Sequence, residues 1–155
     1  MLVPISSTAF QAPSESEVPD VLFDTHLETS LDFSHVKEKL LHGYDKPFLL
    51  VDSNIIRQKT RRFMNAMPRV RPHYAVKANP DRRVLKTLIE EGAGFEIASI
   101  AELDLLLELG VPAAEIFYSN PIKSRAYLEY AAAKGVEWYV LDSVEELRKI
   151  VSVKP

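Results

Sequence analysis

The sequence has no cysteine and few features of membrane or nucleic-acid proteins. Without cysteine the chain forms no disulfides and performs no thiolate chemistry. No apolar run approaches the roughly 20 residues of a membrane-spanning helix, and the N-terminus lacks the basic and apolar regions of a signal peptide. With 19 Lys and Arg against 22 Asp and Glu, the net charge of −3 offers no basic excess to nucleic acid or an anionic membrane. We therefore expect a soluble, cytoplasmic protein that binds neither nucleic acid nor membranes.

Motifs for metal and phosphate binding are also missing. The four histidines have no close ligand spacing and H-E-x-x-H does not occur, so we expect no metal site. Neither G-x-G-x-x-G nor G-x-x-x-x-G-K-[ST] is present, which disfavours dinucleotide- and NTP-binding folds. At 155 residues, with 46 % hydrophobic and 26 % charged residues, the chain has the composition of one globular domain.

The N-terminal residues differ in composition from the rest. Residues 1–20 are rich in Pro, Ser and Glu, which predicts a mobile arm because such a segment buries too little apolar surface to offset the entropy of ordering. Residues 21–45 indicate a weak strand and turn, then a short helix over 34–41. The regular pattern occupies residues 46–155.

Beyond residue 46 short apolar runs alternate with helical patterns. We expect strands at 48–52, 72–77, 95–98, 116–119 and 137–141, and helices at 53–66, 81–91, 100–109, 122–134 and 144–150. Ser53 is the predicted cap of the first helix and Pro121 the predicted start of the fourth. The strand ends recur about every 21 residues, the spacing of compact βα units in a parallel sheet. An open doubly wound sheet or part of a (βα)8 barrel would fit, and the missing glycine motifs weaken the first.

Two of the predicted helix starts share one sequence pattern. Ser99-Ile-Ala-Glu102 and Ser143-Val-Glu-Glu146 are both typical of a capping box. In that motif the serine oxygen accepts a hydrogen bond from the amide three residues on, and the glutamate accepts one from the serine's own amide.

Lys77 follows residues that otherwise predict a buried strand. Along 72–77 alternating side chains place His73, Ala75 and Lys77 on one face, with Lys77 last. A barrel builds its chemistry at the carboxyl ends of its strands, and the small Ala75 leaves room there for a flat group. Desolvation would favour a neutral amine that reacts with an aldehyde cofactor or substrate. A lysine that simply reaches water explains the position equally well.

Separated motifs resemble the N-terminal part of the pyridoxal-phosphate decarboxylases of the ornithine and diaminopimelate group. In order, over about residues 46–150, they are Y-A-V-K-A-N, G-F-[DE]-x-A-S, a Leu-Gly-Val-Pro helix end, Y-[SA]-N-P-x-K and D-S-x-x-E-L. Pro-His-Tyr-Ala-Val-Lys, Gly-Phe-Glu and Ser-Asn-Pro-Ile-Lys together are most similar to the ornithine/lysine decarboxylases. The resemblance implies an α/β fold, the N-terminal half of a (βα)8 TIM-type barrel that holds pyridoxal 5'-phosphate, with N-terminal residues belonging to a second, mostly β domain.

The resemblance also implies roles for three residues and an activity. Lys77 matches the lysine that holds the cofactor covalently, Ala75 a small residue lining the cofactor, and Glu96 an acidic residue near it that is more often Asp in the family. A solvated acid beside Gly94 is the alternative for Glu96. The implied activity is decarboxylation of ornithine to putrescine or of lysine to cadaverine, in polyamine biosynthesis, by a homodimer with shared active sites.

The implied enzyme is longer than this chain, which we expect to be an inactive N-terminal fragment. The expected histidine over the cofactor, the acid at its ring nitrogen, the glycine-rich phosphate site and a partner-subunit cysteine–aspartate pair have no counterpart here. A diaminopimelate decarboxylase, or a non-catalytic decarboxylase-like regulator or cofactor-binding protein, stays open as an alternative. Lys123, in Ser-Asn-Pro-Ile-Lys, is predicted at the surface, with an approach to a phosphate or a partner subunit as the other interpretation.

Overall fold

The computed structural model describes residues 50–153. The predicted arm 1–20, the segment 21–45 with its helix, and residues 48–49 of the first predicted strand lie outside this range. Among the helices of the described residues, none has the length and apolar character needed to cross a membrane.

Helices and short parallel strands alternate in the predicted order. They are α2 (Ser53–Ala66), β1 (His73–Ala75), the 3-10 helix η3 (Val76–Ala78), α3 (Arg82–Glu90), β2 (Gly94–Ile97), α4 (Ile100–Glu108), the 3-10 helix η4 (Ala113–Glu115), β3 (Ile116–Tyr118), α5 (Arg125–Ala133), β4 (Trp138–Tyr139) and α6 (Val144–Val153). The strands form a four-stranded parallel sheet in the order β1-β2-β3-β4. Each strand pairs with its predecessor without a reversal of order, which favours barrel units over a doubly wound sheet.

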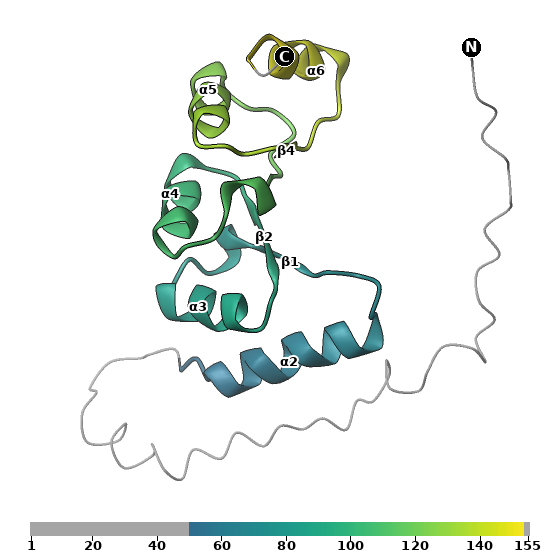
Figure 1. The fold of residues 1–155 in the computed structure, drawn as a ribbon, viewed down its shortest axis with the longest axis vertical. Helices are drawn as coiled ribbons and strands as arrows, with labels where there is room; N and C mark the ends of the chain where they lie inside the picture. Colours follow the sequence, from purple (N-terminus) through teal and green to yellow (C-terminus); the bar gives the residue numbers. More distant parts are fainter. Residues whose placement is uncertain (1–49, 154–155) are drawn as a thin grey trace, which may run out of the picture. The chain divides into compact units, whose positions relative to one another are not determined.

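The hydrophobic core lies between the sheet and helices α3, α4 and α5, which Figure 1 shows along the same side of the strands. Phe95 and Ile97 of β2 face these helices and are 2 % and 1 % exposed. Their neighbours in β3, Ile116 and Tyr118, are equally buried. The helices contribute Leu85, Leu88, Leu103, Leu106 and Ala131. Since successive strand residues face opposite ways, the residues between the buried ones lie on the other face of the sheet.

Glycines end three of the helices. Gly92, Gly110 and Gly135 follow α3, α4 and α5 with φ of 78°, 86° and 93°. In this left-handed region a side chain would strain the backbone, so glycine is the favoured residue. These turns direct the chain back into the next strand.

The start of α2 differs from the prediction. Residues 50–52 are not in a strand. Asp52 caps the helix by accepting a hydrogen bond from the Asn54 N–H at 2.7 Å, so Ser53 is the first helical residue and not the cap. The carboxylate of Asp52 outcompetes the neighbouring hydroxyl because a charged acceptor makes the stronger hydrogen bond.

The start of α5 also lies later than predicted. The helix begins at Arg125, after Ser124 accepts a hydrogen bond from the Tyr127 N–H at 3.2 Å. Pro121 is therefore in the preceding turn and not in the first helical position. The backbone of Lys123 takes no part in the helix because its N–H donates to Glu146 and its carbonyl accepts from Lys149.

Candidate active site

A row of side chains crosses the sheet on the face opposite the helices. Ala75, Glu96, Phe117 and Trp138 are partners in consecutive strand pairs, and such partners in a parallel sheet project to the same side. Glu96 lies between two residues that face the helices, so its carboxylate points the other way. The structure therefore brings Ala75 and Glu96 to adjacent positions on the surface that a barrel would enclose.

Lys77 lies two residues beyond this row, outside β1. Pairing with β2 reaches only Ala75 and Glu96, and Val76–Ala78 form a 3-10 turn. The prediction of a strand through Lys77 is wrong by two residues. Beyond the pairing, the Ala98 N–H donates to the Glu102 carboxylate at 2.7 Å and not to a strand. Lys77 is nevertheless close to the end of β1, at the edge where the carboxyl ends of the strands lie, which we call the carboxyl edge.

The amine of Lys77 is exposed. The described part of the chain gives its Nζ no hydrogen bond or ion pair. The desolvation expected from the sequence is therefore not supplied by these residues. The exposed Nζ is accessible to a small molecule at the carboxyl edge.

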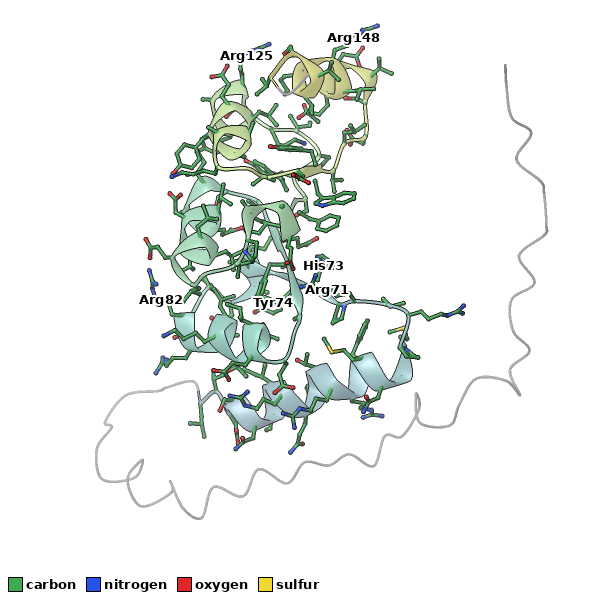
Figure 2. The ribbon with its side chains drawn as sticks, in the orientation of Figure 1. Arg71, His73, Tyr74, Arg82, Arg125 and Arg148 are labelled. Carbon is green, nitrogen blue, oxygen red and sulfur yellow. The ribbon has the colours of Figure 1, made fainter. Side chains whose placement is uncertain are left out.

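Aromatic rings extend the same face of the sheet. The His73 and Phe117 rings meet edge to face, with centroids 4.5 Å apart, and Phe117 stacks on Trp138 at 5.3 Å. A Cβ on Gly94 would come within 2.6 Å of the His73 ring, so glycine makes room for it. Figure 2 shows His73 across the strands from Arg82, which lies on the outer side with α3. Sequence reasoning missed Phe117 and Trp138, although the two-residue period within their strands would have indicated this face.

Lys123 is buried, which contradicts its predicted surface position. It is 2 % exposed, and its Nζ donates to the Val140 carbonyl at 2.6 Å and to the Asn120 carbonyl at 2.8 Å. The Glu146 carboxylate lies 3.2 Å from the same Nζ. An ammonium has three donors, and these contacts occupy them. Within the described residues Lys123 is therefore a structural cation, and neither a phosphate ligand nor a surface residue.

Glu146 explains why Lys123 can be buried. Ser143 accepts a hydrogen bond from the Glu146 N–H at 3.2 Å, which confirms the serine half of the capping box. The carboxylate, however, accepts from the Lys123 N–H at 3.1 Å and contacts Lys149 Nζ at 2.6 Å. Burial acts to raise the pKa of the Glu146 carboxyl, but hydrogen bonds from Lys149 and Lys123 outweigh it and lower that pKa below its usual value. Glu146 is thus the anion between two lysines.

The first capping box also differs in its glutamate half. Ser99 accepts a hydrogen bond from the Glu102 N–H at 3.3 Å, as predicted. Glu102 reaches the Ala98 N–H, one residue before the amide that the motif predicts. Its side chain stays within its own strand–helix turn, whereas Glu146 binds a different turn.

The chain matches a family model. Residues 53–155 match the model described as "Pyridoxal-dependent decarboxylase, pyridoxal binding domain".

No group of three His, Cys, Asp or Glu residues is placed to hold a metal ion in the described range.

Curated relatives cover the same region. The chain is 39 % identical over 113 residues to ornithine decarboxylase of Neurospora crassa, an alignment that covers 73 % of this chain and 23 % of the relative. It is 41 % identical over 108 residues to antizyme inhibitor 2 of Xenopus laevis, covering 70 % of this chain and 24 % of that protein. The chain thus spans about a quarter of the length of these relatives.

The fold is similar to that of a solved structure. Lysine/ornithine decarboxylase from Vibrio vulnificus, complexed with putrescine, superposes with a TM-score of 0.71 at 38 % identity, covering 76 % of this chain and 32 % of that one. This similarity confirms the barrel-type arrangement of the four strands, which the order of the sheet already favours.

Proposed function

This chain belongs to the pyridoxal-dependent decarboxylases, through their pyridoxal-binding domain, and we propose that it contributes the cofactor lysine of an enzyme that decarboxylates a basic amino acid. The observation that carries the proposal is the position of Lys77. Its exposed amine follows β1 at the carboxyl edge, next to the paired positions of Ala75 and Glu96. Barrel enzymes place their reacting groups at this edge.

The residues at this edge fit a flat aldehyde such as pyridoxal phosphate. Lys77 supplies an amine that bonds covalently to the aldehyde carbon, and Ala75 has no side chain beyond Cβ to obstruct a ring. The Glu96 carboxylate lies on the same face and favours a positive charge on a nearby nitrogen. When bound, the cofactor supplies an electron sink for the loss of CO₂. We assign the phosphate to no described residue, since the one buried cation, Lys123, is already saturated.

We propose ornithine or lysine as the substrate. Loss of the carboxyl group as CO₂, with a proton taking its place, converts ornithine to putrescine and lysine to cadaverine. The name of the V. vulnificus neighbour supports this class, because that protein is a lysine/ornithine decarboxylase with bound putrescine. Diaminopimelate is the alternative substrate. We further propose a role in polyamine synthesis, as a homodimer in the cytoplasm.

Covalent trapping tests the role of Lys77. Purified protein is loaded with pyridoxal phosphate, reduced with borohydride, digested and analysed by mass spectrometry. The reduced adduct is expected on the peptide that contains Lys77, and Lys77→Ala should abolish it. Lys86→Ala, at an exposed position of α3, is the matched control and should leave the adduct in place. An adduct that maps to Lys86 or Lys123 would show that the assignment of Lys77 is wrong.

A second candidate function is regulation without catalysis. The identity to X. laevis antizyme inhibitor 2, at 41 %, is about the same as to the ornithine decarboxylase of N. crassa. The matched region therefore favours an enzyme and a protein named as an inhibitor equally. The amine of Lys77 supports the enzyme, because a protein that needs no cofactor has no use for it.

Release of CO₂ separates the two candidates. The protein is incubated with pyridoxal phosphate and carboxyl-labelled ornithine or lysine, and labelled CO₂ is measured. We expect release by the complete protein and none by residues 1–155 alone, which lack the expected groups at the cofactor's phosphate and ring nitrogen. A complete protein that carries the adduct on Lys77 and releases no CO₂ would favour the regulator.

A further inference from the structure

The turn between β3 and α5 is held by the side chain of Lys123. Its Nζ donates to the Asn120 carbonyl, which belongs to this turn, and to the Val140 carbonyl, which follows β4. The same Nζ lies 3.2 Å from the Glu146 carboxylate in the first turn of α6. One ammonium therefore joins the carboxyl ends of two neighbouring strands to the helix that follows them.

The backbone of Lys123 is fixed as well. Its N–H donates to the Glu146 carboxylate at 3.1 Å, and its carbonyl accepts from Lys149 Nζ. Each polar group of Lys123 is therefore bound: the N–H and the carbonyl by Glu146 and Lys149, and Nζ by the carbonyls of Asn120 and Val140.

The turn that Lys123 holds also contacts the end of β2. Ser119 donates to the Ile97 carbonyl through its N–H at 2.9 Å and through its hydroxyl at 3.2 Å. Asn120, whose own carbonyl is bound by Lys123, extends its side-chain amide to the Ala98 carbonyl at 3.4 Å. Ile97 follows Glu96 directly. The contacts therefore run from α6 through Lys123 to the strand end that carries Glu96.

Stability alone does not account for a buried lysine at this position. Removing a charge from water is expensive, and apolar side chains of similar volume often stabilise a core as well as a buried ion pair does. Unlike apolar contacts, the hydrogen bonds of an ion pair are directional and therefore fix the relative positions of the bonded groups. The acceptors here are carbonyls of two turns at the carboxyl edge, so the hydrogen bonds fix the positions of these turns.

We propose that Lys123 is a positioning residue, which holds the turn after β3 against β2 and β4 and so fixes the carboxyl edge beside Glu96 in one geometry. Lys123 does not touch the reacting atoms. Its effect on turnover rests on the proposed function, whereas its effect on the carboxyl edge does not.

Amide hydrogen exchange in the protein without cofactor or substrate tests the positioning directly. Lys123→Met retains an unbranched side chain of similar length and leaves the Asn120 and Val140 carbonyls without their donor. The Ser119 and Val140 amides are expected to exchange about tenfold faster than in the unmodified protein, because the free energy of the local opening that exposes them is then smaller. Lys134→Met is the matched control, since it removes an exposed lysine that follows α5 and binds neither these carbonyls nor Glu146. In this variant the two exchange rates should change by less than about twofold.

Turnover provides the second measurement. Lys123→Met should lower kcat about tenfold with little change in KM. The groups at the carboxyl edge would be displaced, which disturbs their alignment with the reacting atoms more than it weakens substrate binding. Lys134→Met should retain kcat within about twofold. If the unmodified complete protein releases no CO₂, the proposed function fails, and the exchange rates still decide the role of Lys123. Equal exchange rates and equal kcat in the two methionine variants would overturn the positioning role.

If Lys123→Met does not fold, Glu146→Gln takes its place. The amide oxygen of glutamine still accepts from the Lys123 N–H but attracts the ammonium less strongly. Exchange at Ser119 and Val140 should then be faster than in Lys134→Met. Equal rates in Glu146→Gln and Lys134→Met would overturn the proposal.

Discussion

The turn after β1 and the turn after β3 each carry a lysine at the same edge of the sheet, and the two lysines have opposite surroundings. Lys77 is exposed, and its Nζ has no partner within the described residues. Lys123 is buried, with two carbonyls and a carboxylate around its Nζ. The difference arises from α6, which supplies Glu146 to the second turn, whereas no described acid binds the first lysine.

The neighbouring acids explain the contrast. Four residues after Lys77, Asp81 accepts hydrogen bonds from the Arg83 side chain and backbone, and the Arg83 guanidinium holds the pKa of that carboxyl far below its usual value. Asp81 is thereby committed to capping α3. An amine that must react is best left unpaired, and an amine that must hold a structure is best saturated. The surroundings of the two lysines thus match the different roles that we propose for them.

Removing Lys77 should have the largest effect on activity. Lys77→Ala is expected to lower CO₂ release by the complete protein by a factor of about 1,000 or more, because the proposed covalent link to the cofactor would be lost. Unfolding free energy should change by less than about 0.5 kcal/mol, since the side chain is exposed. Steady-state kinetics and urea unfolding measure the two quantities. Retained turnover, or a large loss of stability, would contradict the claim that Lys77 serves activity whereas Lys123 serves structure.

Removing Lys123 should reverse this pattern. Lys123→Ala is expected to lower the unfolding free energy by about 3–5 kcal/mol, because it deletes one partner of a buried ion pair and leaves carbonyls unpaired. Urea unfolding at neutral pH gives the measurement, and Lys134→Ala, at an exposed position that follows α5, is the control. Equal losses in the two variants would mean that Lys123 is not the buried residue described.

The sequence predicts the alternation of the fold because its signals are local. Hydrophobic periods, the glycine after each of three helices and the two serine caps all act within a few residues, and the structure confirms them. The strand limit at Lys77 and the start of α5 were wrong because each depends on distant residues. Pairing with β2 ends at Ala75, and the backbone of Lys123 is bound by α6.

In the candidate site too, features that depend on local sequence were predictable and features that depend on distant contacts were not. Alternation along one strand places Ala75 on the barrel face, and the structure gives Glu96 as its partner. The burial of Lys123 was not predictable from Ser-Asn-Pro-Ile-Lys, because its counter-ion is 23 residues away along the chain. Glu102 and Glu146 occupy the same place in one motif, and only tertiary contacts decide which of them leaves its own turn.

Acid should weaken the turn after β3. The pKa of the Glu146 carboxyl is lowered in the folded protein, so its contribution to stability is fully present above its usual value of 4.5 and is lost as the pH falls through the lowered value. Glu146→Gln removes this titration. The variant should be less stable than the unmodified protein at pH 7 by about 1.5–3 kcal/mol, the worth of hydrogen bonds to a charged group. Below the lowered pKa the difference should shrink, and a constant difference in urea unfolding from pH 7 to acid would contradict the assignment.

Glu96 offers the smallest expected effect on stability and the finest test of the first turn. Its carboxylate shares the row of Ala75 at the end of β2 and has no partner among the described side chains. Glu96→Gln keeps the shape of the side chain and removes its charge, so the melting temperature should hardly change. If the carboxylate favours a positive charge beside the Lys77 nitrogen, turnover should fall about tenfold and the absorbance band of the bound cofactor should titrate at lower pH. Glu137→Gln, at an exposed position that precedes β4, is the control and should alter neither property. An unchanged titration in Glu96→Gln would make Glu96 a solvated acid and leave Lys77 as the one reactive group of its turn.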